Sequence, residues 1–561
     1  MIPPRPTAPA RWRALRDDPR SATAILILAS VASVVAVLWF GRGTTFSGDE
    51  AVWVAATPGI DLRTVFEPHG GHLLALTRLV YWPLLEVFGL AYLPFRLLAI
   101  AATLLAVWLL FVFGRRRTDQ FVALAPCLVL LFFGSDYLHL LQGNGFTVML
   151  SVALGLAALL SLEGGTRRGD LLACLWLVIG VLAYTVILPF VAGAAVLLLL
   201  RRGGERRLWV ALVPAAVYAG WRVWLLLADV SSAGGAVEPS NLALVPSWGF
   251  QAVSAILNAL TGLSYSFAGG NVSTPLDLAG PPLAVAFIAF AGWMVARRGL
   301  RSGLLVAAVI LLSLFTIQAL ASGASGELRT PGDARYMYPG AVVLLLVAFE
   351  LVRGWKPGRP GLLALGLIAL CGVAANLILL RDNAAFVRDS GAELRSLVGA
   401  TELALEGDPQ ASAGALAGQR SIGLGPVFGL RGMALQDYGQ FGYGPDELRQ
   451  QPPERRETAD FLLVTSAVPG LAPPGPDPRV AGCRTVASAA GGPVSLESPP
   501  GRLLLRAAQA GEVSVGRFAD LPGVAVGTLE PGRPAQLLLP ADSAPDPWRI
   551  AFDGPSLKVC R

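Results

Sequence analysis

Charge is scarce in this chain of 561 residues, and lysine is almost missing from it. Only 15% of the residues are charged, whereas a soluble domain carries roughly 25%, and 54% are hydrophobic. Among the 44 basic residues, Lys356 and Lys558 are the only lysines. The net charge of +6 is dispersed as short arginine clusters between apolar runs, which excludes nucleic acid as the expected partner.

Several catalytic signatures are also missing. The chain has no GxxxxGK followed by Ser or Thr, which excludes a Walker-type ATP site, and no GxSxG or HExxH. It has no CxxC and no zinc-finger spacing of cysteines. The apolar runs hold no relay of Asp, Glu and Lys, and the two halves show no repeat, which argues against an ion-coupled transporter.

Apolar runs of about 16–21 residues occupy the chain between residues 22 and 380, and each is long enough to cross ~30 Å of hydrocarbon. The expected fold is a polytopic α-helical membrane protein with about eleven transmembrane helices. The expected spans are residues 22–40, 95–113, 120–134, 146–163, 171–184, 186–200, 208–228, 281–296, 303–321, 338–352 and 361–380. The pair at 171–200 has an alternative interpretation, one long tilted helix.

The arginine clusters predict the orientation, because loops rich in Lys and Arg stay in the cytoplasm. The tail 1–21 is one such cluster, and the run after it lacks a good cleavage site and is expected to remain as a span. The C-terminus of this multi-pass protein of the cell membrane is then extracytoplasmic. The same rule assigns two apolar segments, His72–Tyr92 and Gln251–Phe267, to the outer interface or to re-entrant segments.

Composition predicts four parts. A cytoplasmic tail (1–21) precedes the transmembrane region (22–380), whose outer loop 41–94 holds the interfacial helices. An extracytoplasmic connector of helix and loop (381–458) leads to a β-rich domain (459–561). Together the last two parts form an α+β domain.

Short apolar segments separated by Gly and Pro turns predict a β-sandwich in the β-rich domain. Ala459–Thr465 is predicted as its first, buried strand. The strands expected after it are Leu503–Leu505, Val513–Val515, Val524–Val526, Leu537–Leu539 and Ile550–Phe552.

The five cysteines fall into two groups. Cys127, Cys174 and Cys371 lie in predicted spans, where a free cysteine is usually a small core residue. Cys483 and Cys560 lie in the exported part, where a disulfide is expected. The alternative is two buried free thiols.

An acidic pair follows the first predicted span. A carboxylate at this low-dielectric boundary is poorly solvated, so Asp49 can act as a general base toward a hydroxyl. Its alternative role is to cap an interfacial helix that begins at Glu50. Glu50 is either a second catalytic carboxylate or a dipole partner in the first helical turn.

All three histidines fall in predicted outer loops. His69 and His72 lie three residues apart near Glu67, a set that suits a divalent cation such as zinc or manganese. Contact with substrate or phosphate, or local hydrogen bonds of a glycine-flexed loop, are the alternatives. His139 lies in the next outer loop beside Asp136.

Arg335 and Tyr336 open a late span, where a guanidinium can pair with a phosphate at the level of the lipid headgroups. The alternatives are an arginine that snorkels to lipid phosphate and a tyrosine of the interfacial belt.

The order of these elements resembles the glycosyltransferase C superfamily, which includes protein O-mannosyltransferases and aminoarabinose lipid A transferases. The pair Asp49-Glu50 is followed by the interfacial segment Gly70–Tyr92 and a span that ends in arginines. Arg335-Tyr-Met-Tyr-Pro339 then matches the superfamily's Arg-Tyr-x-x-Pro element. The resemblance covers roughly residues 20–380.

The resemblance implies an inverting-type glycosyltransferase that moves a hexose or pentose from a polyprenyl-phosphate donor to an envelope glycan, lipid or protein outside the membrane. It implies that Asp49 is the base and that Arg335, with Arg78, binds the donor phosphate. The full predicted set for donor or substrate binding is Glu67, His69, His72, Arg78, His139, Arg335 and Tyr336. Membrane lipid is a further expected partner.

One departure from the superfamily keeps other functions open. Many members have Lys-Pro-Pro at the interfacial helix, whereas this chain has His69-Gly-Gly-His72, so the phosphate-binding lysine is missing. Either a histidine or Arg78 replaces it, or the protein is a scaffold or assembly protein with the same fold. A transporter or flippase is the third alternative. No cofactor is expected apart from the divalent cation considered above.

Overall fold

The computed structural model describes residues 18, 20–55, 57, 61–230, 238–263, 279–322, 330–407, 438–474, 482–488 and 492–561. The chain divides into two units. The membrane unit comprises Met1–Phe46 and Gly59–Arg388, and the C-terminal unit comprises Ser47–Pro58 and Asp389–Arg561. Most of the predicted tail, and residues 408–437 of the predicted connector, lie outside the described residues.

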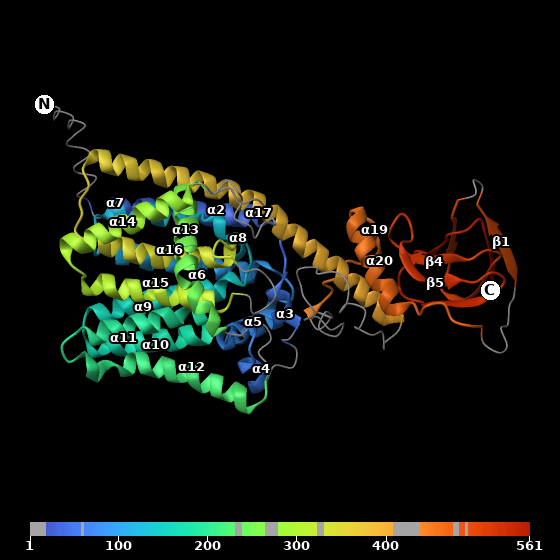
Figure 1. The fold of residues 1–561 in the computed structure, drawn as a ribbon, viewed down its shortest axis with the longest axis horizontal. Helices are drawn as coiled ribbons and strands as arrows, with labels where there is room; N and C mark the ends of the chain where they lie inside the picture. The colour runs from blue at the N-terminus through green and yellow to red at the C-terminus, as the bar shows by residue number, and fades with distance from the viewer. Residues whose placement is uncertain are drawn as a thin grey trace. The chain divides into compact units, whose positions relative to one another are not determined.

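Helices that lie largely side by side build the membrane unit (Figure 1). Their sequences are almost continuously apolar, and in lipid a helix satisfies each backbone N–H within its own segment. The α-helices are α2 (Ser21–Phe40), α4 (Leu62–Phe66), α5 (Ala75–Phe88), α6 (Leu93–Arg115), α7 (Gln120–Leu131), α8 (Tyr137–Leu141), α9 (Gly145–Glu163), α10 (Arg167–Ala183), α11 (Leu188–Leu199), α12 (Trp209–Leu227), α13 (Val245–Thr261), α14 (Gly280–Arg298), α15 (Ser302–Leu320), α16 (Ala334–Leu351) and the first part of α17 (Arg359–Gly407). Short 3-10 helices connect them: η1 (Gly134–Asp136), η2 (Thr185–Ile187), η3 (Gly204–Arg207) and η4 (Pro239–Leu244).

Among the described residues, nine helices are long and apolar enough to cross a membrane, or ten if the bent pair formed by α7 and η1–α8 is one span. The chain is therefore a polytopic membrane protein, as predicted. The two helices α10 and α11 have only 17 and 12 residues, below the roughly 20 that a span needs. They account for part of the difference from the predicted eleven.

The alternative of one long helix over residues 171–200 is wrong. Tyr184 has extended backbone angles, φ −168° and ψ 152°, and separates α10 from η2 and α11. Pro189, in the first turn of α11, has no N–H to continue a helix from the preceding turn. Figure 1 shows α9, α10, α11 and α12 beside one another, in agreement with their packing contacts.

The two segments predicted for the outer interface both form helices. The first, α5, has 14 residues and is not among the candidate spans. The second, α13, continues from η4 into a stretch of 23 residues that is apolar enough to span. In Figure 1, however, α13 runs across the direction of α15 and α16, against which it packs. Residues 264–267 lie outside the described residues, and the interfacial placement of both segments stays a prediction.

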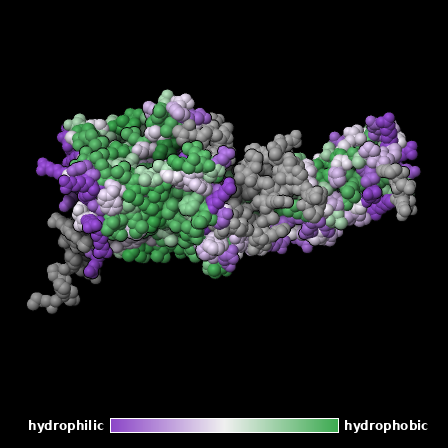
Figure 2. Space-filling view, turned by 90° about the horizontal axis from the view of Figure 1, so that it is seen from below, coloured by the Kyte–Doolittle hydropathy of each residue, from purple (hydrophilic) through white to green (hydrophobic). Residues whose placement is uncertain are grey.

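The surface of the membrane unit is apolar. Figure 2 shows a broad hydrophobic face over its helices, with hydrophilic side chains gathered toward the two ends. Leu28, Leu226 and Leu367 point outward with 71%, 82% and 62% of their surface exposed. Lipid tails solvate such side chains, which explains why they lie outside the core.

The C-terminal unit combines helices with a β-sandwich. Its helices are α3 (Asp49–Ala55), the end of α17, α19 (Pro445–Arg449) and α20 (Pro453–Ala467). The strands are β1 (Cys483–Ala487), β2 (Val494–Ser498), β3 (Gly501–Ala507), β4 (Gly511–Gly516), β5 (Val524–Leu529), β6 (Ala535–Leu539), β7 (Trp548–Phe552) and β8 (Ser556–Cys560). They form two antiparallel sheets with orders β1-β8-β3-β6 and β2-β7-β4-β5. All five segments predicted after residue 500 are strands, whereas β1, β2 and β8 were not predicted.

The prediction of a strand at Ala459–Thr465 is wrong, because these residues lie within helix α20. Pro453 and Glu454 in its first turn are helix-start residues. Its buried residues recur at helical spacing, since Asp460, Leu463, Val464 and Ala467 share one face. A short apolar run cannot by itself distinguish a strand from a buried helix.

The expected disulfide is present in the structure. Cys483 and Cys560 are register partners at the facing ends of β1 and β8, and their sulfur atoms are joined. The bond closes a sequence separation of 77 residues. In the membrane unit, Cys127 and Cys174 are buried as expected, but Cys371 is exposed. Its face of α17 points outward, so the expectation of a core residue is wrong there.

Candidate functional site

A break between α7 and α8 positions the first group of candidate residues. The two parts meet at an angle of 41°. Asn376 of α17 is fully buried, and its Oδ1 accepts hydrogen bonds from the Ser135 N–H at 3.0 Å and the Ser135 hydroxyl at 2.9 Å. Its Nδ2 donates to the carbonyls of Ala259 and Gly372, both at 2.9 Å. Backbone groups near the break are therefore hydrogen-bonded by a side chain of the helix bundle, because in lipid there is no water to bind them.

The break places a buried carboxylate beside a histidine. Nδ1 of His139 lies 2.8 and 2.9 Å from the two carboxylate oxygens of Asp136, which is fully buried. Asp136 also accepts the backbone N–H of His139 at 3.3 Å and that of Tyr338 at 3.0 Å. A proton on Nδ1 directed at Asp136 leaves Nε2 as the acceptor of a neutral imidazole. The pair can thus receive and hold a proton.

Arg335 belongs to the same neighbourhood. It lies in the first turn of α16, three residues before Tyr338, whose backbone N–H donates to Asp136. Pro339 follows within that helix and cannot donate to the carbonyl of Arg335, which opens the hydrogen-bond ladder at this point. The first turn of α16 therefore brings Arg335 into the neighbourhood of the Asp136–His139 pair and of Tyr137, the residue after Asp136.

Tyr336, the other predicted residue of this helix start, packs against an aromatic ring. Its ring meets Trp248 of α13 edge-on, with 6.0 Å between ring centroids. This contact ties the first turn of α16 to α13. The structure therefore gives Tyr336 a packing role, and its predicted substrate contact stays a prediction.

His69 and His72 form a tight hairpin. Each donates its backbone N–H to the carbonyl of the other, at 3.0 and 2.9 Å. The residues between them, Gly70 and Gly71, have φ of 54° and 81°, and a type I′ turn needs positive φ at both positions. The glycines are therefore explained by the turn.

The side chain of His72 leaves this hairpin toward the link between α10 and α11. Its Nδ1 lies 2.6 Å from the Thr185 hydroxyl, and its ring stacks at a tilt on Tyr184 with 4.3 Å between centroids. In the described part of the chain, no group of three or more His, Cys, Asp or Glu side chains could hold a metal ion. The geometry thus provides no support for the divalent cation considered at His69, His72 and Glu67.

Arg78 and Glu67 organise the backbone before this hairpin. Arg78 is buried in α5 and donates Nη1 to the carbonyl of Glu67 at 2.8 Å and to that of Thr64. Burial lowers the pKa of Arg78, and the charge of Glu67 raises it. The Glu67 carboxylate pairs with Arg63 at 3.5 Å. Arg78 thus holds the end of α4, and its predicted contact with a donor phosphate stays a prediction.

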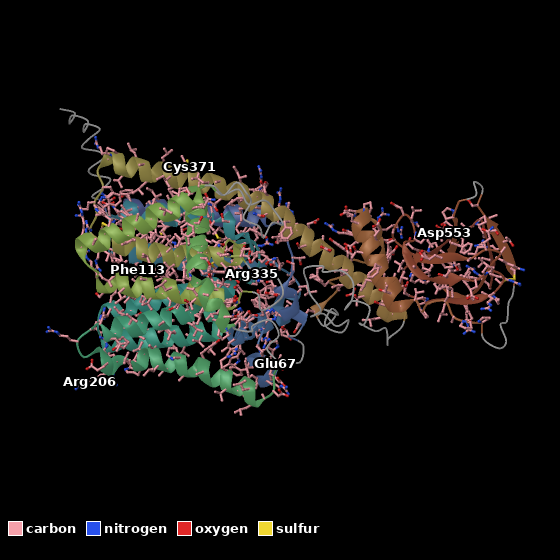
Figure 3. All side chains as sticks on the ribbon, viewed as in Figure 1. Glu67, Phe113, Arg206, Arg335, Cys371 and Asp553 are labelled. Atoms are coloured by element: carbon pink, nitrogen blue, oxygen red, sulfur yellow. A yellow bond between two sulfur atoms is a disulfide. The ribbon has the colours of Figure 1, made fainter. Side chains whose placement is uncertain are left out.

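His139 and the partner residues of His72 both lie near the first half of helix α9. The short helix α8 packs against α9, and Ser151 of α9 donates its hydroxyl to the carbonyl of Tyr184, the ring partner of His72. Figure 3 places Glu67 and Arg335 at the same end of the membrane unit, and Arg206 at the other end. The structure therefore brings the predicted residues of the membrane unit to one end.

Asp49 and Glu50 lie in the C-terminal unit. Helix α3 begins at Asp49, so both carboxylates stand in its first turn, where they interact favourably with the helix dipole. Asp49 is exposed and Glu50 is fully buried. The alternative role of Asp49 as a cap required a helix that begins at Glu50, whereas α3 begins one residue earlier, at Asp49 itself. The catalytic role of Asp49 stays a prediction.

The sequence did not predict the contacts of several residues in this region. Asp136 was noted only as a neighbour of His139, although a carboxylate three residues before a histidine on a helix is a local signal for a pair. Tyr137 and Thr185 carry no such signal, because only the fold brings them to Arg335 and His72. Arg96, buried in α6, donates to the carbonyl of Thr44 at 3.3 Å, and by sequence it resembles an ordinary flanking charge.

Comparisons with known proteins give a likeness of fold. No family model matches the chain, and no curated protein matches it. The structure is similar to that of ArnT from Cupriavidus metallidurans in the apo state, with 13% identity, a TM-score of 0.44, and coverage of 70% of this chain and 82% of that chain. It is also similar to the same protein bound to undecaprenyl phosphate, with 14% identity, a TM-score of 0.41, and coverage of 68% and 81%.

Proposed function

We propose that this protein is a membrane glycosyltransferase that moves a sugar from a polyprenyl-phosphate donor to a hydroxyl of an envelope glycan, lipid or protein outside the cytoplasm. The observation that supports the proposal is the grouping of Arg335, Tyr137 and the Asp136–His139 pair at one end of a membrane-embedded unit. A cation beside a proton acceptor, in a unit whose outer face is apolar, suits a lipid-linked phosphate leaving group.

The reaction is a single displacement with inversion. The acceptor hydroxyl attacks C1 of the sugar, and the bond between C1 and the phosphate oxygen breaks. The hydroxyl proton passes to a general base, for which the sequence pattern nominates Asp49. The phosphate leaves with an added negative charge, which a guanidinium such as that of Arg335 stabilises by charge-assisted hydrogen bonds.

Asp49→Asn tests the proposal, because the amide keeps the shape of the side chain and cannot take the proton. Cells that lack the protein are complemented with wild-type or variant chain, and their envelope glycans and glycolipids are compared by mass spectrometry. We expect transfer to fall roughly 10²–10⁴-fold, the usual contribution of a general base, with the level of membrane-inserted protein unchanged. Asp553→Asn, at an exposed turn of the β-sandwich, is the matched control and should leave transfer intact.

A binding measurement separates the enzyme from a scaffold. Purified wild-type protein should bind polyprenyl phosphate, and Arg335→Ala should weaken that binding about tenfold or more, as expected for loss of a charge-assisted contact. Full transfer by Asp49→Asn would remove Asp49 as the base. Absence of polyprenyl-phosphate binding, together with wild-type growth of Arg335→Ala cells, would favour the scaffold.

A further inference from the structure

A cavity of about 400 Å³ lies within the membrane unit, away from the site described above. It is formed where α6, α9, α11 and α16 end and α15 begins. Figure 3 shows Phe113, which lines the cavity, toward the opposite end of the unit from Arg335, on the same side as Arg206. The proposed transfer reaction makes no use of this cavity.

The lining of the cavity has a charged part and an apolar part. Four arginines and two glutamates line it, which leaves an excess of two positive charges. The charged residues are Arg116, Arg117, Arg201, Arg353, Glu163 and Glu350. Most of the other lining residues are leucine, isoleucine, valine, phenylalanine or alanine, and Ser302 and Gly303 complete the wall. A ligand that fits this lining has an anionic group and an apolar portion.

The two glutamates are held by three of the arginines. Glu350, with a side chain only 1% exposed, pairs with Arg117 and, at 3.2 Å, with Arg353. Glu163 pairs with Arg116 at 2.6 Å and with Arg117 at 2.8 Å. These networks fix the carboxylates in place, so the negative charges are already neutralised.

The position of Glu350 depends on Gly303 in the first turn of α15. A Cβ atom on Gly303 would lie only 2.6 Å from the Glu350 carboxylate, so the absence of a side chain lets that carboxylate approach the helix. Glu350, which pairs with Arg117 and Arg353, is therefore part of the packing of α15 against α16.

Arg201 is the arginine with capacity left for a ligand. Its Nη1 donates to the carbonyl of Leu162 at 2.6 Å, at the end of α9, and in the described part of the chain it forms no ion pair within 4.0 Å. A guanidinium has five N–H donors, and its planar fork matches two phosphate oxygens. Arg116 and Arg353 have side chains about half exposed, 50% and 48%, so this rim is accessible.

We infer that this cavity binds the phosphate headgroup of an anionic membrane lipid, with the first part of an acyl chain against the apolar wall. The excess positive charge selects a net negative headgroup, and basic pockets between transmembrane helices are known sites for such lipids. Leu200 lines the cavity and is 46% exposed, and its neighbour Leu199 at the end of α11 is 60% exposed, so the apolar wall reaches the outer surface at this point. Free phosphate shares the headgroup chemistry but makes no use of that wall.

The test uses full-length protein, delipidated in neutral detergent and titrated with phosphatidylglycerol, phosphatidylcholine or inorganic phosphate. Native mass spectrometry and thermal unfolding report binding. We expect phosphatidylglycerol to bind about tenfold more tightly than phosphatidylcholine, and inorganic phosphate to bind weakly. Arg201→Gln should reduce phosphatidylglycerol affinity about tenfold, as loss of one charge-assisted contact predicts. Arg206→Gln, at an exposed position that does not line the cavity, should change it less than about twofold.

Arg353→Gln is the second variant, and it keeps the test decisive if Arg201→Gln fails to fold. It removes a half-exposed lining cation and should also lower phosphatidylglycerol affinity. Equal affinity for the two phospholipids would overturn the inference, because the arginines would then serve only to neutralise glutamates and helix ends. The inference would also be overturned if the two lining variants and Arg206→Gln had the same affinity for phosphatidylglycerol. Stabilisation by inorganic phosphate equal to that by phosphatidylglycerol would overturn the lipid assignment.

Discussion

The membrane unit and the C-terminal unit each bury an aspartate that accepts backbone N–H groups. In the C-terminal unit, Asp460 of α20 accepts three consecutive N–H groups, from Arg517 and Phe518 at 2.8 Å and from Ala519 at 2.9 Å. In the membrane unit, Asp136 accepts two N–H groups and the ring of His139. The Asp460 carboxylate binds backbone N–H groups, whereas the Asp136 carboxylate also orients the imidazole of His139. The second arrangement is the one that can take part in chemistry.

The two units also differ in where their apolar side chains lie. Trp548, Ile550 and Phe552 of β7 are fully buried in the sandwich, so removal from water stabilises this unit. The outward leucines of the membrane unit stay in apolar surroundings, and burial contributes little there. Packing and hydrogen bonds at helix breaks, such as those of Asn376, must therefore hold the membrane unit together.

The largest effect is expected for Asp460→Ala. It leaves three buried N–H groups of the β4–β5 connection without an acceptor, at roughly 1–3 kcal/mol each, so the C-terminal unit should lose at least about 3 kcal/mol. Pulse proteolysis of the full chain in urea measures this loss. The exposed Asp553→Ala should stay within about 0.5 kcal/mol. Equal stability of the two variants would show that Asp460 is not a structural anchor.

A smaller effect is expected for Asn376→Ala in the membrane unit. It removes hydrogen bonds to Ser135, Ala259 and Gly372, and such bonds average about 0.6 kcal/mol in membrane proteins, which predicts a loss of about 2 kcal/mol. Thermal unfolding in detergent measures it. Asn241→Ala, which removes one side-chain bond to Ser322, is the control and should cost less. A larger loss from the control would contradict the assignment of the break to Asn376.

The smallest effect is expected for Asp136→Asn. The amide keeps the shape but loses the charge that orients His139, so transfer should fall about tenfold, or ~1.4 kcal/mol, with the protein still folded. The pH profile of transfer is the distinguishing measurement, because a positioning role through the imidazole changes its shape and a purely structural role lowers it uniformly. If the transfer rate and its pH profile did not change, the role of Asp136 would be structural, through its backbone hydrogen bonds, as for Asp460.

Much of the fold could be predicted because its patterns are local. Apolar runs of span length identify the membrane helices, and short apolar segments separated by Gly and Pro turns identify β3 to β7. The strand predicted at Ala459–Thr465 failed because a short apolar run suits either a buried strand or a helix. The bend between α7 and α8 was not predicted, because Asn376, which satisfies it, lies 241 residues away from Ser135.

Local patterns were enough to predict a multi-pass membrane protein with an appended β-sandwich, because hydrophobic length and period depend on neighbouring residues alone. The sequence also nominated the histidines and Arg335. Only the tertiary structure showed that His72 meets Thr185 and Tyr184, that Asn376 binds Ser135, and that arginines following several helices surround one cavity. Those groupings depend on which helices pack together, and contacts across long sequence separations leave no trace in a local pattern.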